Sequence, residues 1–111
     1  MQMTAQHREG VTIIYPKGKI TIGLGDVALR EAVHEALDAG ATKILINLKS
    51  VSTADSSGIG EMVSAYTTVT NRGGALKLCE LPNKVTDVLQ ITQLITVFDV
   101  FDTEDEAIAS F

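Results

Sequence analysis

Apolar positions three or four residues apart predict two long helices in this chain. The first is expected to begin near Asp26, a residue suited to capping a helix, and to stop at Gly40. The second is expected to run from Ser57 to about Asn71 and to end before a Gly-Gly pair. The apolar stripes consist of Leu29, Val33, Ala36 and Leu37 in the first helix, and Ile59, Met62, Val63, Tyr66 and Val69 in the second.

Short runs rich in β-branched and other apolar residues predict the strands. Val11–Tyr15 and Lys19–Ile22 flank the turn sequence Pro16-Lys17-Gly18, so we expect them to form an opening β-hairpin. Residues 1–8 are mostly polar and are expected to be a flexible end. Further strands are expected at Lys43–Leu48, covered on both faces, at Ala75–Leu81 and at Ile95–Phe101, with a loop at Val51–Asp55.

Two shorter helices complete the pattern. One is expected to begin at Asn83, and the other at Glu104, where Thr103 and Glu106 form a capping box. Strands that alternate with helices are typical of an α/β domain, and the hairpin adds an antiparallel pair. We therefore expect a single α/β domain over residues 9–110, with a mixed, mostly parallel β-sheet and about four helices.

Composition and charge exclude several classes of function. The 111 residues are enough for one domain, and they carry 9 basic and 14 acidic side chains, for a net charge of −5. An acidic chain is poorly suited to binding nucleic acid or anionic lipid, so we expect neither as a partner. The single cysteine, Cys79, excludes an internal disulfide. Without an apolar signal segment or a membrane-length apolar run, the chain is expected to be cytoplasmic.

The segment Thr53–Gly60 is the strongest candidate for a functional site. It joins a buried strand to a strongly periodic helix, and it places two adjacent serines, Ser56 and Ser57, at the start of that helix. Gly58 and Gly60 follow in the first turn, where each lowers helix stability by about 1 kcal/mol relative to alanine. Sequences that give up local stability often do so at functional sites.

On the residues alone, two interpretations of this segment are open. In the first, Ser56 or Ser57 caps the helix, and the glycines permit tight packing of helix against strand. In the second, a serine hydroxyl at the positive end of the helix dipole accepts a phosphate, and the glycines let another molecule approach the backbone.

The sequence Asp55-Ser56-Ser57-Gly58-Ile59-Gly60 resembles the D-S-[ST]-G-L-G signature of the STAS domain family, whose best-known soluble members are bacterial anti-sigma factor antagonists. The resemblance extends in order from about residue 9 to residue 109. Two positions depart from the family pattern: Thr21 replaces an aspartate, and Gln93 replaces a glycine that is often found before the last strand. The other matching segments are Gly18–Thr21, Lys43–Leu48, Gly73–Leu78, Val85, Leu89 and Thr103–Ile108.

The resemblance implies a protein-binding module that phosphorylation controls. It makes Ser56 the phosphate acceptor and an anti-sigma factor serine kinase the partner, with a serine phosphatase to reverse the modification. The unphosphorylated form sequesters the kinase and thereby regulates transcription. The surface that binds the partner is expected to involve Thr21 and the neighbours of Ser56, with no cofactor and no metal. These neighbours are Asp55, Ser57, Gly58 and Ile59.

Two other classes of function are weighed against this one. Domains of the same fold also serve as scaffold subunits of stress-signalling or lipid-transport complexes without a phosphoswitch. An enzyme with Ser56 or Ser57 as nucleophile needs a general base, and the nucleophile-elbow pattern G-x-S-x-G is absent.

His7 and His34 are isolated, and we expect them to be surface residues rather than metal ligands. The sequence gives no oligomeric state.

Overall fold

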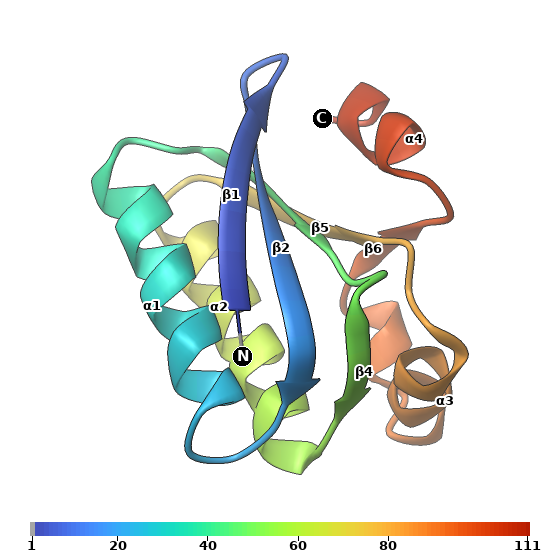
Figure 1. Ribbon diagram of the computed structural model, residues 1–111. Coiled ribbons are helices and arrows are strands. Elements are labelled where there is room, and N and C mark those ends of the chain that lie inside the picture. The colour runs from blue at the N-terminus through green and yellow to red at the C-terminus, as the bar shows by residue number, and fades with distance from the viewer. Residues whose placement is uncertain (1) are drawn as a thin grey trace.

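Six strands and four α-helices alternate along residues 2–111, the part of the chain that the computed structural model describes (Figure 1). A 3-10 helix, η1, precedes the last strand. The elements are β1 (Gln2–Arg8), β2 (Val11–Ile20), α1 (Gly25–Asp38), β3 (Lys43–Asn47), β4 (Val51–Ala54), α2 (Ser56–Asn71), β5 (Ala75–Cys79), α3 (Asn83–Ile91), η1 (Leu94–Thr96), β6 (Asp99–Phe101) and α4 (Glu104–Ala109).

The strands form one mixed sheet in the order β1-β2-β3-β5-β6, and β4 pairs with the far end of β2. Only the β1–β2 pair is antiparallel; the other pairs are parallel. The predicted class is therefore confirmed: a single α/β domain with a mixed, mostly parallel sheet and four helices. No helix within residues 2–111 has the length and apolar character needed to cross a bilayer.

Helices cover both faces of the sheet, as the three consecutive apolar residues 44–46 in the middle of β3 predict. Ile44 and Ile46 belong to the larger core cluster, which also contains the buried side chains of α1, α2 and α3. Leu45 points to the other face and packs in a second cluster with Ala107 and Ile108 of α4. Figure 1 shows α1 and α2 on one side of the sheet and α4 on the other.

The N-terminal segment differs from its prediction. Gln2–Arg8 is strand β1 rather than a flexible end, and it pairs with β2 along its whole length. An opening hairpin is present, but β1 and β2 form it rather than the two predicted strands, and its turn lies at Glu9 and Gly10, where both φ angles are positive. The domain therefore starts before residue 9. β1 could not be predicted because six of its seven residues are exposed and only two, Met3 and Ala5, are apolar, which is too few to mark a strand.

The expected turn at Pro16-Lys17-Gly18 is wrong as well, because β2 continues through it to Ile20. Thr12–Ile14 pairs with β3, whereas Gly18–Ile20 pairs with β4. Pro16 lies between these two paired segments, where β2 changes partner. A proline is tolerated there because its missing N–H has no ladder hydrogen bond to make.

Two further expectations about strands need correction. Val51–Ala54, expected as a loop, is the short strand β4. Only Asp99–Phe101 of the predicted strand Ile95–Phe101 pairs with β5. The residues before it include η1 and the partly buried Ile95 and Val97, which pack against the larger core cluster. A continuous apolar run does not distinguish such a packed turn from a strand.

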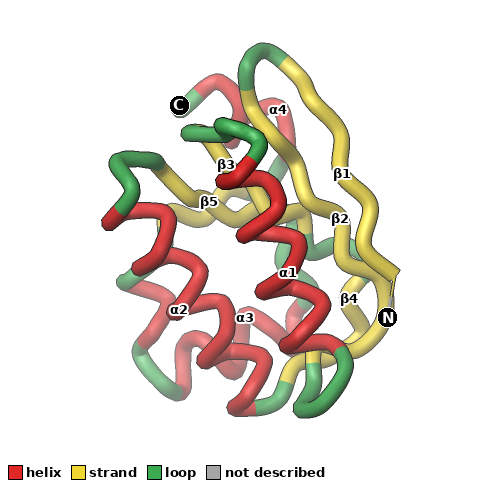
Figure 2. Tube along the Cα trace, turned by 90° about the vertical axis from the view of Figure 1, so that its left-hand side faces the viewer, coloured by secondary structure: helices red, strands yellow, loops and turns green. Residues whose placement is uncertain are grey.

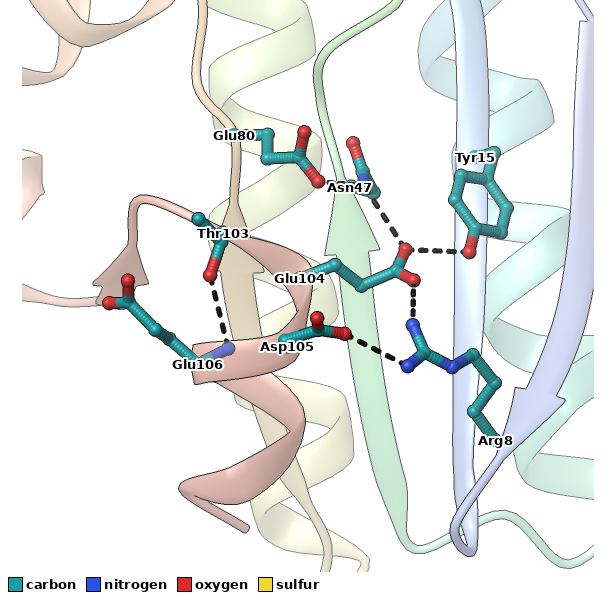
Figure 3. Close-up of polar contacts among 8 residues, drawn as sticks. All are labelled: Arg8, Tyr15, Asn47, Glu80, Thr103, Glu104, Asp105 and Glu106. Atoms are coloured by element: carbon teal, nitrogen blue, oxygen red, sulfur yellow. Dashed lines mark hydrogen bonds and ion pairs between the residues drawn. The ribbon is translucent and has the colours of Figure 1, made fainter.

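A polar cluster joins α4 to the sheet (Figure 3). The carboxylate of Glu104 accepts hydrogen bonds from the Tyr15 hydroxyl at 2.6 Å, from the Asn47 amide at 3.1 Å and from the Arg8 guanidinium. Burial opposes ionisation of Glu104, but these three hydrogen bonds outweigh it and lower its pKa. Thr103 caps α4, since its hydroxyl accepts a hydrogen bond from the Glu106 N–H, which is the Thr103 half of the predicted capping box.

Candidate functional site

Ser56 is the first residue of α2, and its side chain is exposed. It follows directly after β4, whose pairing with the end of β2 fixes where α2 begins. A hydroxyl at this place faces the positive end of the helix dipole, which favours an added negative charge. The structure therefore places the predicted phosphate acceptor where another macromolecule can reach it.

Asp55, and neither serine, caps α2. Its Oδ1 accepts a hydrogen bond from the Gly58 N–H at 2.9 Å, and its Oδ2 accepts one from the Ile22 N–H at 3.1 Å. The bond from Gly58, followed by the bond from Ile22, lowers the pKa of Asp55. The interpretation of Ser56 or Ser57 as the cap is thus wrong, because the aspartate takes that role and leaves the Ser56 hydroxyl free for other chemistry.

Gly58 permits close contact between α2 and β2. A Cβ atom built on Gly58 would lie 1.9 Å from the carbonyl oxygen of Ile20, a distance that no real contact allows. Gly25 has the same role for α1, since its Cβ would lie 2.3 Å from the Lys19 carbonyl oxygen. Gly60 differs, because its Cβ would point into open space. Gly58 is therefore a packing residue, and only Gly60 leaves the helix backbone open to an approaching molecule.

An apolar surface surrounds Ser56. On one side, the loop between β2 and α1 exposes 73% of Ile22 and 76% of Leu24. On the other side lies a groove of about 360 Å³, which α2 and the end of α3 enclose. Ile91, near this groove at the end of α3, is 82% exposed. The residues that line the groove are Ala54, Asp55, Ser56, Ile59, Gly60, Val88, Thr92 and Leu94.

The remaining predicted site residues lie close to Ser56 but differ in exposure. Thr21 and Ser57 are half-buried, and the Thr21 carbonyl accepts a hydrogen bond from the Asp26 N–H. Ile59 is only 3% exposed, so it supports the surface from beneath together with Gly58. Ile22, Leu24 and Ile91 could not be assigned to the site from the sequence, because an exposed apolar side chain in a loop or at a helix end has no periodic signal.

Other chemistries find little support in the described residues. Burial raises the pKa of the Cys79 thiol to about 12, which keeps it in its unreactive protonated form. His7 on β1 and His34 on α1 are both exposed, and neither belongs to an element that carries Ser56. Within residues 2–111, no three His, Cys, Asp or Glu side chains gather as metal ligands would.

The Asp55 cap of α2 predicts how the free energy of unfolding depends on pH. Because folding lowers the pKa of Asp55, its charged form stabilises the fold above about pH 4, and this contribution is lost as pH falls through the lowered pKa. Asp55→Asn is therefore expected to unfold at lower urea concentration than wild type at pH 7, with a smaller difference near pH 3. Asp87→Asn, at an exposed carboxylate of α3, is the control. A difference that stays constant over this range would contradict the assignment.

The fold and the serine-bearing start of α2 together define a known class of domain. A family model described as "STAS domain" matches residues 2–107, so the chain belongs to the STAS domain family. Among its relatives is the anti-sigma F factor antagonist of Paenibacillus polymyxa, which is 26% identical over 109 residues. The match covers 97% of this chain and 92% of the relative.

Solved structures share this fold over nearly the whole chain. The crystal structure of TM1081 from Thermotoga maritima superimposes with a TM-score of 0.89 at 26% identity, covering 97% of this chain and 92% of TM1081. The anti-sigma factor antagonist SpoIIAA in its unphosphorylated form superimposes with a TM-score of 0.73 at 22% identity, covering 98% of this chain and 96% of SpoIIAA. The likeness to SpoIIAA is one of fold.

Proposed function

We propose that this chain is an anti-sigma factor antagonist, a protein-binding module that phosphorylation of Ser56 switches off. The observation that carries the proposal is an exposed serine at the start of α2, next to an apolar groove and two exposed apolar side chains. The name of the Paenibacillus polymyxa relative supports the same class of function.

The partner in this proposal is an anti-sigma factor that is also a serine kinase. In its unphosphorylated form, the chain sequesters this kinase and so influences transcription, and a serine phosphatase restores that form. The kinase supplies the nucleotide and its magnesium, so the chain itself needs no cofactor and is not an enzyme. A cytoplasmic location fits this role.

The residues around Ser56 divide into two roles. Ser57, Thr21 and the exposed part of Asp55 contribute polar groups to the contact surface, while Gly58 and Ile59 support it from beneath. A phosphate on Ser56 adds a charge of about −1.5 to −2 in the middle of this surface. A partner that covers the apolar groove must then desolvate that charge, which opposes binding.

Phosphorylation in vitro tests the proposal. The chain is incubated with ATP, magnesium and its cognate anti-sigma factor kinase, and the modified residue is located by mass spectrometry. Phosphate is expected on Ser56 of the wild type and of Ser57→Ala, and none is expected on Ser56→Ala. If the cognate kinase leaves Ser56 unmodified, the result favours a scaffold subunit without a phosphoswitch.

A further inference from the structure

The sheet has one long free edge, which is strand β1. β1 is the terminal strand of the sheet order, and no described element pairs with its outer side. It has seven residues, whereas β6 at the opposite edge has three. Figure 2 shows β1 running along the outside of the molecule next to α1. Exposed edges of this length are templates for pairing with another strand unless charges, prolines or bulges protect them, and Arg8 is the only charged residue in β1.

The hairpin geometry fixes which backbone groups of β1 point outward. Arg8 faces Val11 across a two-residue turn in which Glu9 and Gly10 both have positive φ, as in a type I′ turn. The residues that flank such a turn form a hydrogen-bonded pair, and such pairs alternate along an antiparallel ladder. The N–H and C=O groups that face away from β2 therefore belong to Met3, Ala5 and His7.

We propose that two copies of this chain associate through β1, in an antiparallel pairing with Ala5 of one copy opposite Ala5 of the other. In this register Met3 of each copy faces His7 of the other, so all three outward residues form hydrogen-bonded pairs. The three N–H groups of each copy donate to the other, which makes six main-chain hydrogen bonds. The sheet then continues across a two-fold axis, which is the commonest symmetry of protein oligomers.

Charge favours a second copy as the occupant of this edge. The chain has a net charge of −5, so most pairs of its surfaces repel each other, yet residues 2–8 contain no carboxylate. In the proposed register Arg8 faces Gln2, and Thr4 faces Gln6, so no like charges meet. Two copies can therefore pair along residues 2–8 without like charges facing each other across the two strands.

The surface beside β1 also has room for the second copy. Two adjoining cavities of about 280 and 250 Å³ lie between β1 and α1, and small side chains form much of their lining. A two-fold axis through Ala5, perpendicular to the sheet, places α1 of both copies on the same face. Side chains of the second copy can then enter these cavities. Their shared lining residues are His7, Thr12, Ala36 and Ala39.

Sedimentation equilibrium of the full chain tests the pairing. Wild type is expected to show a reversible monomer–dimer equilibrium. Ala5→Pro removes both Ala5 N–H groups from the interface but none from the β1–β2 ladder, so we expect the dissociation constant to rise by about tenfold or more. Ala5→Thr keeps the N–H and is the matched control. A wild-type chain that stays monomeric at millimolar concentration overturns the proposal.

A pair of charged variants tests the register and does not depend on proline. Ala5→Lys and Ala5→Glu each place like charges opposite one another across the axis, so each is expected to be monomeric when alone. When mixed, they are expected to form a heterodimer, because the lysine then faces the glutamate. Circular dichroism checks that both variants fold. If each variant dimerises as well as the wild type, or if the mixture yields no heterodimer, Ala5 does not lie on the axis and the proposal fails.

Discussion

Phosphorylation of Ser56 is expected to weaken binding of the anti-sigma factor by roughly thirty- to a hundredfold, which corresponds to about 2–3 kcal/mol. The phosphate adds a dianion next to a groove whose lining is mainly apolar, and binding would remove that dianion from water. Ser56→Asp carries a single negative charge at the same place. We expect it to weaken binding in the same direction and by a smaller factor, while folding like the wild type.

Isothermal titration calorimetry measures this effect, with Ser64→Asp as the control. Ser64 is also exposed and lies on the same helix, so the control adds the same charge to α2 farther from its start. The control is expected to bind like the wild type. Because Asp55 caps α2, Ser56→Ala is expected to retain both stability and binding. Equal affinity of the phosphorylated and unphosphorylated chains would contradict the switch.

Gly58→Ala is expected to lower the free energy of unfolding by about 3 kcal/mol or more. The new methyl group would lie 1.9 Å from the Ile20 carbonyl oxygen, which is backbone and cannot rotate away. The first turn of α2 must then move off β2. Since Ser56 is in this turn, we expect the variant to lose partner binding together with stability.

Gly60→Ala is the matched substitution two residues later in the same helix. A Cβ atom at Gly60 meets no atom within 4 Å, so alanine there is expected to raise the free energy of unfolding by up to about 1 kcal/mol. Urea denaturation measures both variants. Equal effects of the two substitutions would mean that the contact between Gly58 and Ile20 does not hold α2 in place.

The position of the site could be predicted from the sequence, but its surroundings could not. The hexapeptide that begins at Asp55 lies at the start of a strongly periodic helix, and these two signals together locate Ser56. In the sequence, Gly58 and Gly60 are equivalent, since both are glycines in the first turns of the same helix. Their difference depends on Ile20, which is 38 positions before Gly58 and has no sequence relation to it.

For the fold too, some elements could be predicted from the sequence and others could not. The two long helices could be predicted because their apolar residues follow the period of a helix, and β3 could be predicted because it is a short apolar run bounded by polar residues. β1 gives only a weak signal, since Met3 and Ala5 are its only apolar residues and neither is fully buried. Pro16 is a turn signal within its local sequence, and it is compatible with β2 only because β3 ends its pairing before it and β4 begins after it. Whether a strand tolerates a proline at such a position depends on neighbouring strands that are distant in the sequence.

The first turns of α1 and α2 both press against the last two residues of β2, through Gly25 and Gly58. The loop between β2 and α1 carries Ile22 and Leu24, and the Ile22 N–H donates a hydrogen bond to the Asp55 carboxylate. The Asp55 carboxylate therefore connects the apolar loop to the start of α2, where Ser56 lies. A protein that binds across the loop and Ser56 orders little of this chain, so the loss of conformational entropy on binding is small. A small contact area can therefore suffice for tight association that is still readily reversible.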